Sequence, residues 1–512
     1  RLEGQDRPLL FGGRCDKYDE RRKAPENLPD LFAFREQALF AELRSQAGKP
    51  APRGKMGLPL VFLAHDLLPF YSALLRGLGF EPVATERTNR VMVRLGGQAL
   101  AADTCHPVKA AFGHCLALAR QRLPLFAPCV VNLAQPGEPD RLPCPLTQSF
   151  PHLLASRLRQ EGSPAKVLAP VIRTDLGPGF LHESLRRCFA EYGVSGRELD
   201  KALTAARSAQ ERFEQALRAK GREVLDGLKA PAVVLLGRAY NAFDPGLNLD
   251  LPRKLAALGV LALPQDLLPA EDESGLEGMY WRSGRSILRA ARFVRGHSQL
   301  FALRLGSFSC GPDSFIDKGL DREMAGKPML CLEIDEHTAD AGLLTRCEAF
   351  LDSIQGLKPP ARLARPKPRK RDVDLRSRVL YGPRMSDHCL GMAAAFRSCG
   401  IEARVLPETG PEAMDLARSY VSGKECYPCA VTTADLLAKV LAPDFDPERS
   451  AFFMPGGSGP CRFGQYAAHH RLVLEIAGAG DVPLYSPVQD ARLYRDLAGA
   501  GRGFSRRCWE AI

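Results

Sequence analysis

A five-residue segment that occurs twice constrains the fold of this 512-residue chain more than any other feature. Asp103–Pro107 reads Asp-Thr-Cys-His-Pro and Lys424–Pro428 reads Lys-Glu-Cys-Tyr-Pro, so both contain Cys-x-Pro with an acidic residue nearby. The two segments lie 321 residues apart, and the same offset holds without a gap for the residues that precede them. The pairs are Asp66 and Asp387, Ala73 and Ala394, Arg76 and Arg397, Gly79 and Gly400, and Glu81 and Glu402. A repeated unit that brings a cysteine to the same place predicts similar domains gathered around a metal–sulfur centre.

Length and composition indicate a multidomain protein. A chain of 512 residues is too long for one core and should form roughly three or four domains. Apolar and charged contents of 45% and 25% are ordinary for a globular protein. No run approaches the ~20 apolar residues of a membrane-spanning helix, and the first residues do not open a signal peptide, so we expect a cytoplasmic protein without a membrane segment. Because the sequence does not begin with Met, we expect it to be part of a longer chain.

The net charge of +11 raises the question of nucleic-acid binding. The Lys and Arg residues are dispersed, except for one dense run from Arg362 to Arg378. That run is Pro-rich and has no interleaved aromatic residues, which favours a solvated linker over a nucleic-acid surface. An acidic partner or a phosphate-bearing ligand such as a CoA ester is compatible with the charge.

The alternation of short apolar runs with helical patterns predicts an α/β protein with several Rossmann-like parallel-sheet domains, a helical spacer and a metal centre at the domain junction. In the first unit the predicted elements are a strand at 58–63, a helix at 67–78, a strand at 80–83, a helix at 89–95, a strand at 98–101, a helix at 108–120 and a strand at 125–133. The predicted organisation is an N-terminal segment at 1–55, α/β domains at 56–180, 230–360 and 378–512, a helical spacer at 181–229 and a basic linker at 361–377. We assign no chemistry to the spacer.

Cysteines are the strongest candidates for site residues. There are fifteen, and because disulfides are unusual in a reducing compartment, metal ligation or redox chemistry is expected for some of them. Six lie beside Gly or Pro in loops, mostly between a strand and a helix: Cys15, Cys105, Cys144, Cys310, Cys426 and Cys461. A helix N-terminus favours the thiolate form that metals bind. An ordinary turn with an incidental cysteine is the alternative for Cys15 and Cys144. Others fit plain core positions: Cys188, Cys331, Cys347 and Cys399.

Two further segments have a functional and an ordinary interpretation. Gly237-Arg238 follows an apolar strand and could hold an anionic group, although a surface Arg beside a turn is favoured. Asp335-Glu336-His337 could bind a hard metal ion, although a solvated loop is favoured. No phosphate-binding loop and no G-x-G-x-x-G after a strand occurs, so an ATP site is expected on another chain or another part of a longer one.

The distribution of the six cysteines bears on which metal they would bind. None belongs to a zinc-type pair of CxxC motifs, and Cys426-x-x-Cys429 stands alone. Ligands contributed one per loop suit a centre buried where domains meet, and soft thiolates without histidine partners favour iron–sulfur over zinc. Zinc and the absence of a metal remain as alternatives.

Several segments resemble a known family. They are Ser307–Asp313, Gly459–Tyr466, Asp103–Pro107, Pro143–Phe150, Gly12–Cys15 and Glu425–Pro428. In the same order over nearly the whole chain, these resemble the acyl-CoA dehydratase activase-related proteins, which are similar to the catalytic component of 2-hydroxyacyl-CoA dehydratases and benzoyl-CoA reductases. The resemblance implies Rossmann-like domains, iron–sulfur clusters of the 4Fe-4S or double-cubane type held by the six cysteines, and a homodimer. It also implies a partner ATPase of the actin/sugar-kinase type, which is fused upstream in longer relatives.

Two functions follow from the residues and the resemblance together. In the first, the protein is an iron–sulfur component of ATP-driven, low-potential electron transfer that activates or reduces acyl-CoA-type substrates. In the second, it is a non-catalytic activator or assembly subunit that docks an ATPase to a separate dehydratase and has no cluster of its own.

Overall fold

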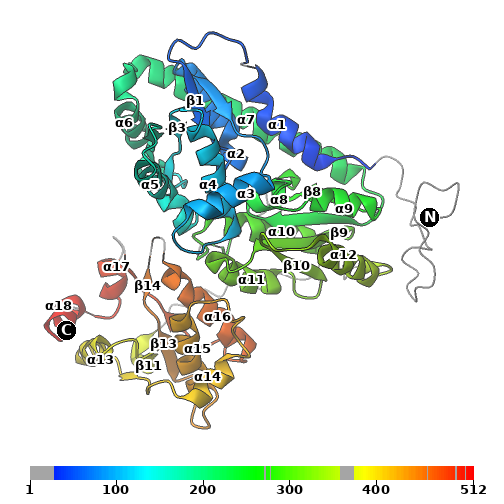
Figure 1. Cartoon of the computed structure of the whole chain (residues 1–512). Coiled ribbons are helices and arrows are strands. Elements are labelled where there is room, and N and C mark those ends of the chain that lie inside the picture. The colour runs from blue at the N-terminus through cyan, green and yellow to red at the C-terminus, as the bar shows by residue number, and fades with distance from the viewer. Residues whose placement is uncertain are drawn as a thin grey trace.

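The computed structural model of the chain contains three four-stranded parallel sheets, each flanked by helices (Figure 1). It describes residues 28–45, 47–269, 272–276, 278–357, 374–457, 459, 461–489, 493–501 and 503–511. The predicted α/β class with several parallel-sheet domains is confirmed. Cys15 and most of the basic run from Arg362 to Arg378 lie outside the described residues.

The first sheet has the strand order β2-β1-β3-β5. Its strands are β1 (Lys55–Leu58), β2 (Glu81–Ala84), β3 (Leu125–Phe126) and β5 (Val167–Leu168), and a second small sheet pairs β4 (Cys129–Asn132) with β6 (Val171–Arg173). The surrounding helices are α1 (Leu31–Ser45), α2 (Ala64–Gly77), α3 (Arg90–Ala99), α4 (His106–Ala119), α5 (Pro145–Gln160) and α6 (Pro178–Cys188). The short 3-10 turns η2 (Thr174–Leu176) and η3 (Ala190–Tyr192) flank α6.

The predicted helical spacer contains the long helix α7 (Gly196–Asp226), which packs against α2. Ser195 caps its N-terminus, because the Ser195 side chain accepts a hydrogen bond from the Glu198 amide while the Glu198 carboxylate accepts from the Ser195 amide. One face of α7 is buried through Leu199, Leu203 and Phe213. The helix is therefore part of the main hydrophobic core and holds the first two sheets together.

The second sheet has the order β8-β7-β9-β10. Its strands are β7 (Ala232–Gly237), β8 (Leu261–Pro264), β9 (Leu300–Ser307) and β10 (Met329–Ile334). Its helices are α8 (Ala239–Phe243), α9 (Leu251–Ala257), η4 (Gln265–Leu267), α10 (Arg282–Gly296), α11 (Gly311–Glu323) and α12 (Asp340–Ile354). Strands β7 and β9 are buried along their whole length, as expected for central strands of a parallel sheet covered on both faces.

The third sheet has the order β12-β11-β13-β15. Its strands are β11 (Val379–Gly382), β12 (Ala403–Val405), β13 (Ser450–Phe453) and β15 (Leu484–Tyr485), and a small sheet pairs β14 (Gly456–Gly457) with β16 (Val488–Gln489). Its helices are η5 (Leu375–Ser377), α13 (His388–Ser398), α14 (Pro411–Ala417), α15 (Tyr427–Val440), η6 (Arg462–Gln465), α16 (Tyr466–Ile476), α17 (Leu493–Ala498) and α18 (Phe504–Ala511). In all three sheets, the first strand in sequence lies between the second and the third.

The first and third units repeat one another in detail. Helices α4 and α15 are both 14 residues long and begin and end at positions that differ by the same 321 residues. Helices α2 and α13 each end two residues before a glycine of positive φ, Gly79 (81°) and Gly400 (79°). Only glycine adopts this left-handed backbone without strain, which explains why the pair recurs at the helix ends.

Three strand predictions in the first unit are wrong. The predicted strand at 58–63 is shifted to Lys55–Leu58, because Pro59 lacks an amide hydrogen and Phe62 has a left-handed φ of 47°. The predicted strand at 98–101 does not form, since α3 continues to Ala99 and packs along α4. The predicted strand at 125–133 is divided into β3 and β4, which lie in different sheets and are separated by Ala127-Pro128.

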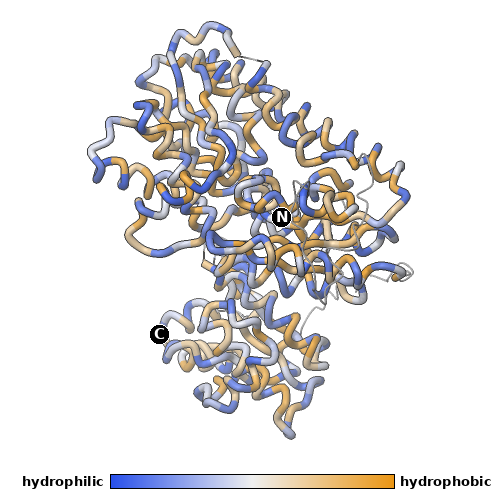
Figure 2. The backbone as a smooth tube through the Cα atoms, turned by 45° about the vertical axis from the view of Figure 1, so that its right-hand side comes forward, coloured by the Kyte–Doolittle hydropathy of each residue, from blue (hydrophilic) through white to orange (hydrophobic). Residues whose placement is uncertain are grey.

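One large hydrophobic core runs through all three units, and each unit also has a smaller core of its own. Figure 2 shows hydrophobic stretches interspersed with hydrophilic residues along the backbone. Between the first and second units, Gly246 lies so close to Thr88 that a Cβ atom would be 2.0 Å from the Thr88 carbonyl oxygen. Between the second and third units, the Gln465 side chain donates to the Gly278 carbonyl at 2.8 Å.

A buried polar chain supports the contact between the first and second units. The Thr88 hydroxyl donates to Asp244 at 2.6 Å, so it accepts from His114 Nε2, 2.8 Å away. The Thr85 hydroxyl lies 2.6 Å from His114 Nδ1. Burial lowers the pKa of His114 to about 4. His114 is therefore neutral in the folded protein and has both ring nitrogens in hydrogen bonds.

The crossing of α3 and α4 gives a first prediction. A Cβ atom at Gly113 would be 1.9 Å from the Met92 carbonyl oxygen, whereas nothing lies within 4 Å of a Cβ atom at Gly97 in the same pair of helices. We expect Gly113→Ala to lower the free energy of unfolding by about 1–3 kcal/mol through overpacking. Gly97→Ala is the control and should leave stability unchanged or raise it by up to about 1 kcal/mol. Urea unfolding measures both, and equal effects would contradict the close helix contact.

The buried state of His114 predicts a pH dependence. Its pKa is about 4 when folded and about 6.5 when unfolded, so the unfolded chain binds more protons between these values. We therefore expect His114 to contribute a loss of about 3 kcal/mol in the free energy of unfolding as the pH falls from 6.5 to 4. Comparing the slopes of wild type and His114→Gln by denaturant unfolding isolates this contribution. Identical slopes would show that His114 does not titrate as described.

Candidate functional site

The five described cysteines of the predicted set share one structural position. Cys105, Cys144, Cys310, Cys426 and Cys461 are the N-cap residues of α4, α5, α11, α15 and η6, respectively. None of their side chains caps its own helix through a hydrogen bond. Proline occupies the first turn of the four α-helices, where its missing amide hydrogen costs nothing. The thiols therefore stand at helix N-termini without a capping role.

The sheet topology explains why these positions recur. Cys105 and Cys426 begin the helices that lead into the third strands of the first and third sheets. Cys144, Cys310 and Cys461 begin the segments that lead into the fourth strand of each sheet. In the second sheet, the N-cap of the helix before the third strand is Trp281. Helices that follow parallel strands start at the carboxyl edge of the sheet, where open α/β sheets bind their ligands.

One group of thiols lies around Tyr240, in the short helix α8 that follows β7. Burial raises the pKa of Tyr240 well above its ordinary value, and the negative charges of Cys144, Cys310 and Cys105 raise it further. Arg238 opposes this effect. The three cysteines come from two sheets, so the first and second units contribute jointly to this group.

Arg238 is buried, and the surface position favoured from the sequence is wrong. Only 2% of its area is exposed, and its guanidinium lies 2.9 Å from the Asp313 carboxylate. Arg304 contacts the other oxygen of Asp313 at 2.8 Å. Burial alone would raise the pKa of Asp313, but the two guanidinium groups hold it at about 2. The ion pair thus places both the Asp313 carboxylate and the Arg238 guanidinium close to Cys310.

The thiol pKa values differ from the expectation based on helix N-termini. Burial raises the pKa of Cys105 to about 11, and the charge of Cys144 adds to the increase. Burial and Asp313 raise the pKa of Cys310 well above its ordinary value. Removing a thiolate from water opposes ionisation more strongly than the helix dipole favours it. Without a bound cation, these two cysteines are thiols.

A second group of thiols lies in the third unit, around Tyr466. The Tyr466 hydroxyl and Cys426 Sγ form a hydrogen bond of 2.7 Å. Burial raises the pKa of Tyr466, followed by the hydrogen bond with Cys426 and by the charges of Cys426, Cys429 and Cys461. Cys429 is buried and was not among the predicted ligands. Its position one helical turn after Cys426 was the only available sequence signal.

The two groups are linked by side chains of the second and third units. The Tyr280 hydroxyl donates to the Cys461 carbonyl at 2.8 Å. A Cβ atom at Gly311 would lie 2.9 Å from the Arg462 guanidinium, so Arg462, which follows Cys461, packs beside the residue that follows Cys310. Phe315 of α11 stacks on Tyr466 with 6.2 Å between ring centroids. The cysteine loops of the second and third units therefore meet.

The Asp335-Glu336-His337 loop also belongs to this region. Glu336 lies 3.3 Å from His106 and forms an ion pair with Lys109, both in the first turn of α4 after Cys105. His337 is exposed. Glu336 thus fixes the start of α4 against β10, as an ordinary interaction between units.

Among the residues that the structure describes, no group of three or more His, Cys, Asp and Glu side chains is arranged to hold a metal ion. The metal centre at the domain junction therefore stays a prediction. Of the cysteines expected in the core, Cys347 is buried, Cys188 and Cys399 are partly buried, and Cys331 is exposed. Cys331 was placed wrongly because its strand, β10, lies at the edge of the second sheet.

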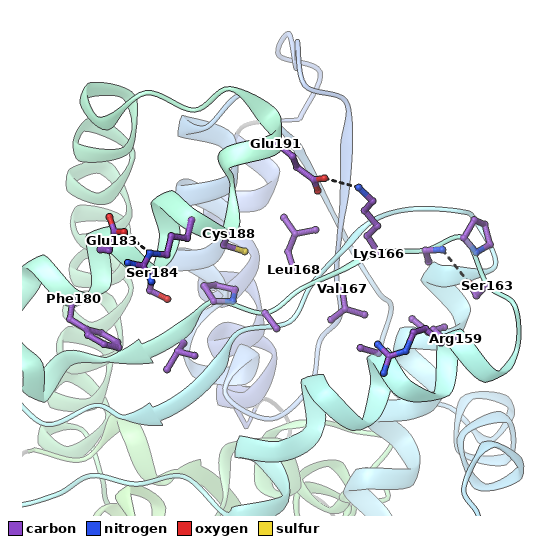
Figure 3. Close-up of a pocket in the computed structure, with 18 residues that line it drawn as sticks. Arg159, Ser163, Lys166, Val167, Leu168, Phe180, Glu183, Ser184, Cys188 and Glu191 are labelled. Atoms are coloured by element: carbon purple, nitrogen blue, oxygen red, sulfur yellow. Dashed lines mark hydrogen bonds and ion pairs between the residues drawn. The ribbon is translucent and has the colours of Figure 1, made fainter.

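A large pocket in the first unit lies away from the cysteine groups (Figure 3). It has a volume of about 1000 Å³ and is lined by segments of α5, β5 and α6. An ion pair between Lys166 and Glu191 lies at its edge, and Cys188 faces it. None of the predicted ligand cysteines lines this pocket.

Comparisons with known proteins bear on the first part of the chain. Residues 55–268 match the family described as the CoA enzyme activase uncharacterised domain. The match supports the activase-related part of the resemblance and covers Cys105 and Cys144. No match was found among curated proteins.

A solved structure also aligns with the chain. It is the dinucleotide forming acetyl-coenzyme A synthetase 1 of Ca. Korarchaeum cryptofilum in complex with phosphate and ADP. The sequences are 10% identical over 91% of this chain and 97% of that chain, with a TM-score of 0.16. A likeness at this score carries no argument about fold or function.

No helix in the described parts of the chain combines the length and apolar character needed to cross a bilayer.

The buried ion pair beside Cys310 gives the third prediction. Arg238→Met leaves Asp313 buried with one cationic partner in place of two. We expect a loss of about 3 kcal/mol or more in the free energy of unfolding, because a buried charge then lacks part of its compensation. Arg506→Met is the matched control, since Arg506 pairs with Glu510 on an exposed helix face and should contribute less than about 0.5 kcal/mol. Chemical denaturation measures both, and similar losses would contradict the ascribed role of burial.

Proposed function

We propose that the protein is an iron–sulfur activator component of an acyl-CoA dehydratase type of system. The observation that carries the proposal is the shared placement of five cysteines at helix N-caps, in two groups that meet between the units. The match of residues 55–268 to a CoA enzyme activase domain supports the system to which it would belong. A cytoplasmic location would keep these thiols reduced.

The residues of both groups fit an iron–sulfur cluster in their donor chemistry. The first group offers Cys105, Cys144 and Cys310, and the second offers Cys426 and Cys461, with Cys429 nearby. These donors are soft sulfur ligands without a capping role, which suit iron. A cluster bound there would supply one-electron transfer at low potential.

The chain itself would contribute three things to such a centre. Arg238 places a buried positive charge among the first group of thiols and would compensate the negative charge of a thiolate-bound cluster. The Tyr466 hydroxyl would donate a hydrogen bond to Cys426 Sγ. The aromatic rings of Tyr240, Phe315 and Tyr466 would limit the access of water.

A second function, an activator or assembly subunit without a cluster, is favoured by one observation. The thiols in the described parts of the chain are not arranged as a preformed metal site. In that case, the loops where the three units meet would serve to dock other proteins. In either case, the partner would be an ATPase of the actin/sugar-kinase type, and a dehydratase with a CoA-ester substrate would be the target.

Iron analysis tests the proposal. After anaerobic purification, we expect iron and acid-labile sulfide in the wild-type protein. Cys105→Ala and Cys426→Ala should each lose about half of the iron or more, because each removes a ligand from a different group. Cys188→Ala is the control and should keep its iron, since Cys188 faces the pocket in the first unit.

The alternative makes the opposite prediction. A colourless wild-type protein without iron, after anaerobic purification and reconstitution with iron and sulfide, would overturn the iron–sulfur proposal and favour the docking subunit. Equal iron loss in all three variants would show that the cysteines have been sorted wrongly.

A further inference from the structure

A second cavity lies between the first and second units, beside the first group of cysteines. Its volume is about 410 Å³, and its walls come from the loop after β1, the helices α7 and α10, and the loop after β7. Cys144, Arg238 and Tyr240 all line it. Helix α7, for which the sequence suggested only a spacer role, supplies Gln210, Phe213 and other residues to the wall.

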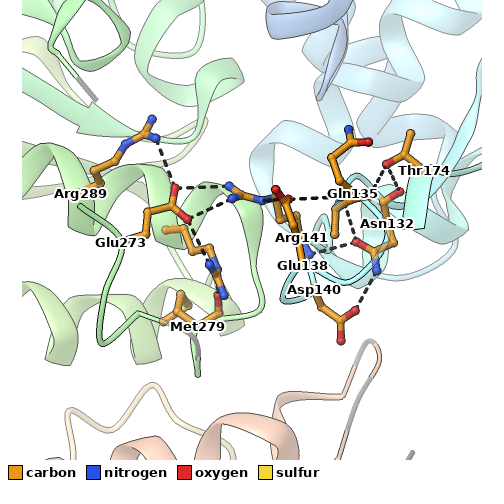
Figure 4. Close-up of polar contacts among 11 residues, drawn as sticks. Asn132, Gln135, Glu138, Asp140, Arg141, Thr174, Glu273, Met279 and Arg289 are labelled. Atoms are coloured by element: carbon orange, nitrogen blue, oxygen red, sulfur yellow. Dashed lines mark hydrogen bonds and ion pairs between the residues drawn. The ribbon is translucent and has the colours of Figure 1, made fainter. Parts of the chain in front are cut away.

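The wall of this cavity carries an excess of positive charge. Arg141, Arg218, Arg238, Arg282 and Arg289 line it, together with three carboxylates. Arg141 and Arg289 both pair with the carboxylate of Glu273, which also pairs with Arg285 (Figure 4). Glu273 lies 3.1 Å from Arg141, 3.1 Å from Arg285 and 3.3 Å from Arg289.

The crowding of guanidinium groups has an electrostatic consequence at Arg289. Burial lowers the pKa of Arg289, and the charges of Arg141 and Arg282 lower it further, against the opposing effect of Glu273. An anion bound between these side chains would relieve this repulsion. Guanidinium groups pair with carboxylates through two parallel hydrogen bonds, so they suit an oxyanion in particular.

The buried polar side chains of the wall differ in their bonding. Arg238 is 98% buried, and its guanidinium is fully paired, with Nε and Nη2 each 2.9 Å from Asp313 and Nη1 donating to Ser283 at 3.0 Å. Gln210 Oε1 is buried without a hydrogen-bond partner. Buried polar groups are rarely left unsatisfied, and an amide oxygen only accepts, so this atom suits a donor such as a water molecule that hydrates a bound anion.

Part of the wall is apolar. Phe62, Phe213, Leu217, Phe243 and Leu268 line the same cavity. A pocket of this size that combines apolar side chains with convergent charged groups can hold a small molecule. The lining therefore favours a ligand with one anionic end and an apolar body over an inorganic anion.

We propose that this cavity binds a small carboxylate with an apolar body, held at its carboxylate by the arginines Arg282 and Arg289. The phenylalanine side chains enclose the apolar part. The site needs no cluster, so it stands or falls independently of the iron–sulfur proposal. Its place beside Cys144 puts such a ligand next to the first group of thiols.

Calorimetric titration of the full chain, without added iron, tests the proposal. The probes are hexanoate, hexan-1-ol, inorganic phosphate and coenzyme A. We expect saturable binding of hexanoate and much weaker binding of hexan-1-ol and phosphate, because one lacks the charge and the other the apolar body. Arg289→Gln should raise the Kd for hexanoate about tenfold or more, since it removes a charged hydrogen-bond donor.

Two further variants serve as controls. Arg207→Gln changes an exposed arginine of α7 outside the cavity and should leave the Kd unchanged. Arg289→Lys keeps the charge but loses the planar fork and should bind with intermediate affinity. Thermal unfolding without ligand verifies that each variant is folded, and Arg282→Gln replaces Arg289→Gln if the latter is not.

Three results would overturn the proposal. The first is equal binding of hexanoate and hexan-1-ol, and the second is an unchanged Kd in Arg289→Gln and Arg282→Gln. The third is binding of coenzyme A without binding of hexanoate, which would identify the nucleotide part of coenzyme A as the ligand.

Discussion

Arg238 and Asp313 form an ion pair with almost no exposure to water, and the surroundings of the first cysteine group depend on it. The pair joins the end of β7 to the first turn of α11, so it sets the direction in which the helix leaves Cys310. Two charges removed from water are stable only while they compensate one another. Arg304 completes the compensation from β9. Arg238 also lines the cavity between the first two units, so this one side chain belongs to both the cysteine group and the cavity.

Three copies of one strand order give this chain a common edge at which helices begin. In a parallel sheet, every crossover helix starts at the carboxyl ends of the strands, so the N-caps of different units can face one another. Five of the described N-caps are cysteines, whereas Trp281 occupies the equivalent position in the second unit. Trp281 is fully buried and contacts Tyr280, whose hydroxyl reaches the loop of Cys461. At the N-cap of the helix before the third strand, the second unit thus has an aromatic side chain, whereas the other two units have a thiol.

Much of the fold could be predicted from the sequence because its signals are local. The offset of 321 residues, the glycines at helix ends and the prolines after cysteines report backbone requirements that lie within a few residues. The strands at 58–63 and 98–101 were predicted wrongly because short apolar runs do not distinguish a strand from a turn or a helix end. The close approach of α3 to α4 at Gly96 and Gly113 decides the latter case.

The sequence by itself determined the α/β class, the repeat and the helix starts at Cys105 and Cys426, whereas Cys144, expected in a non-helical loop, begins α5. Only the tertiary structure decided which cysteines lie together, that Arg238 is buried, and that burial outweighs the helix dipole at Cys105 and Cys310. It also decided that α7 and α10 enclose a cavity lined by arginines. Burial and charge environment are sums over residues far apart in sequence, and no local pattern contains that information.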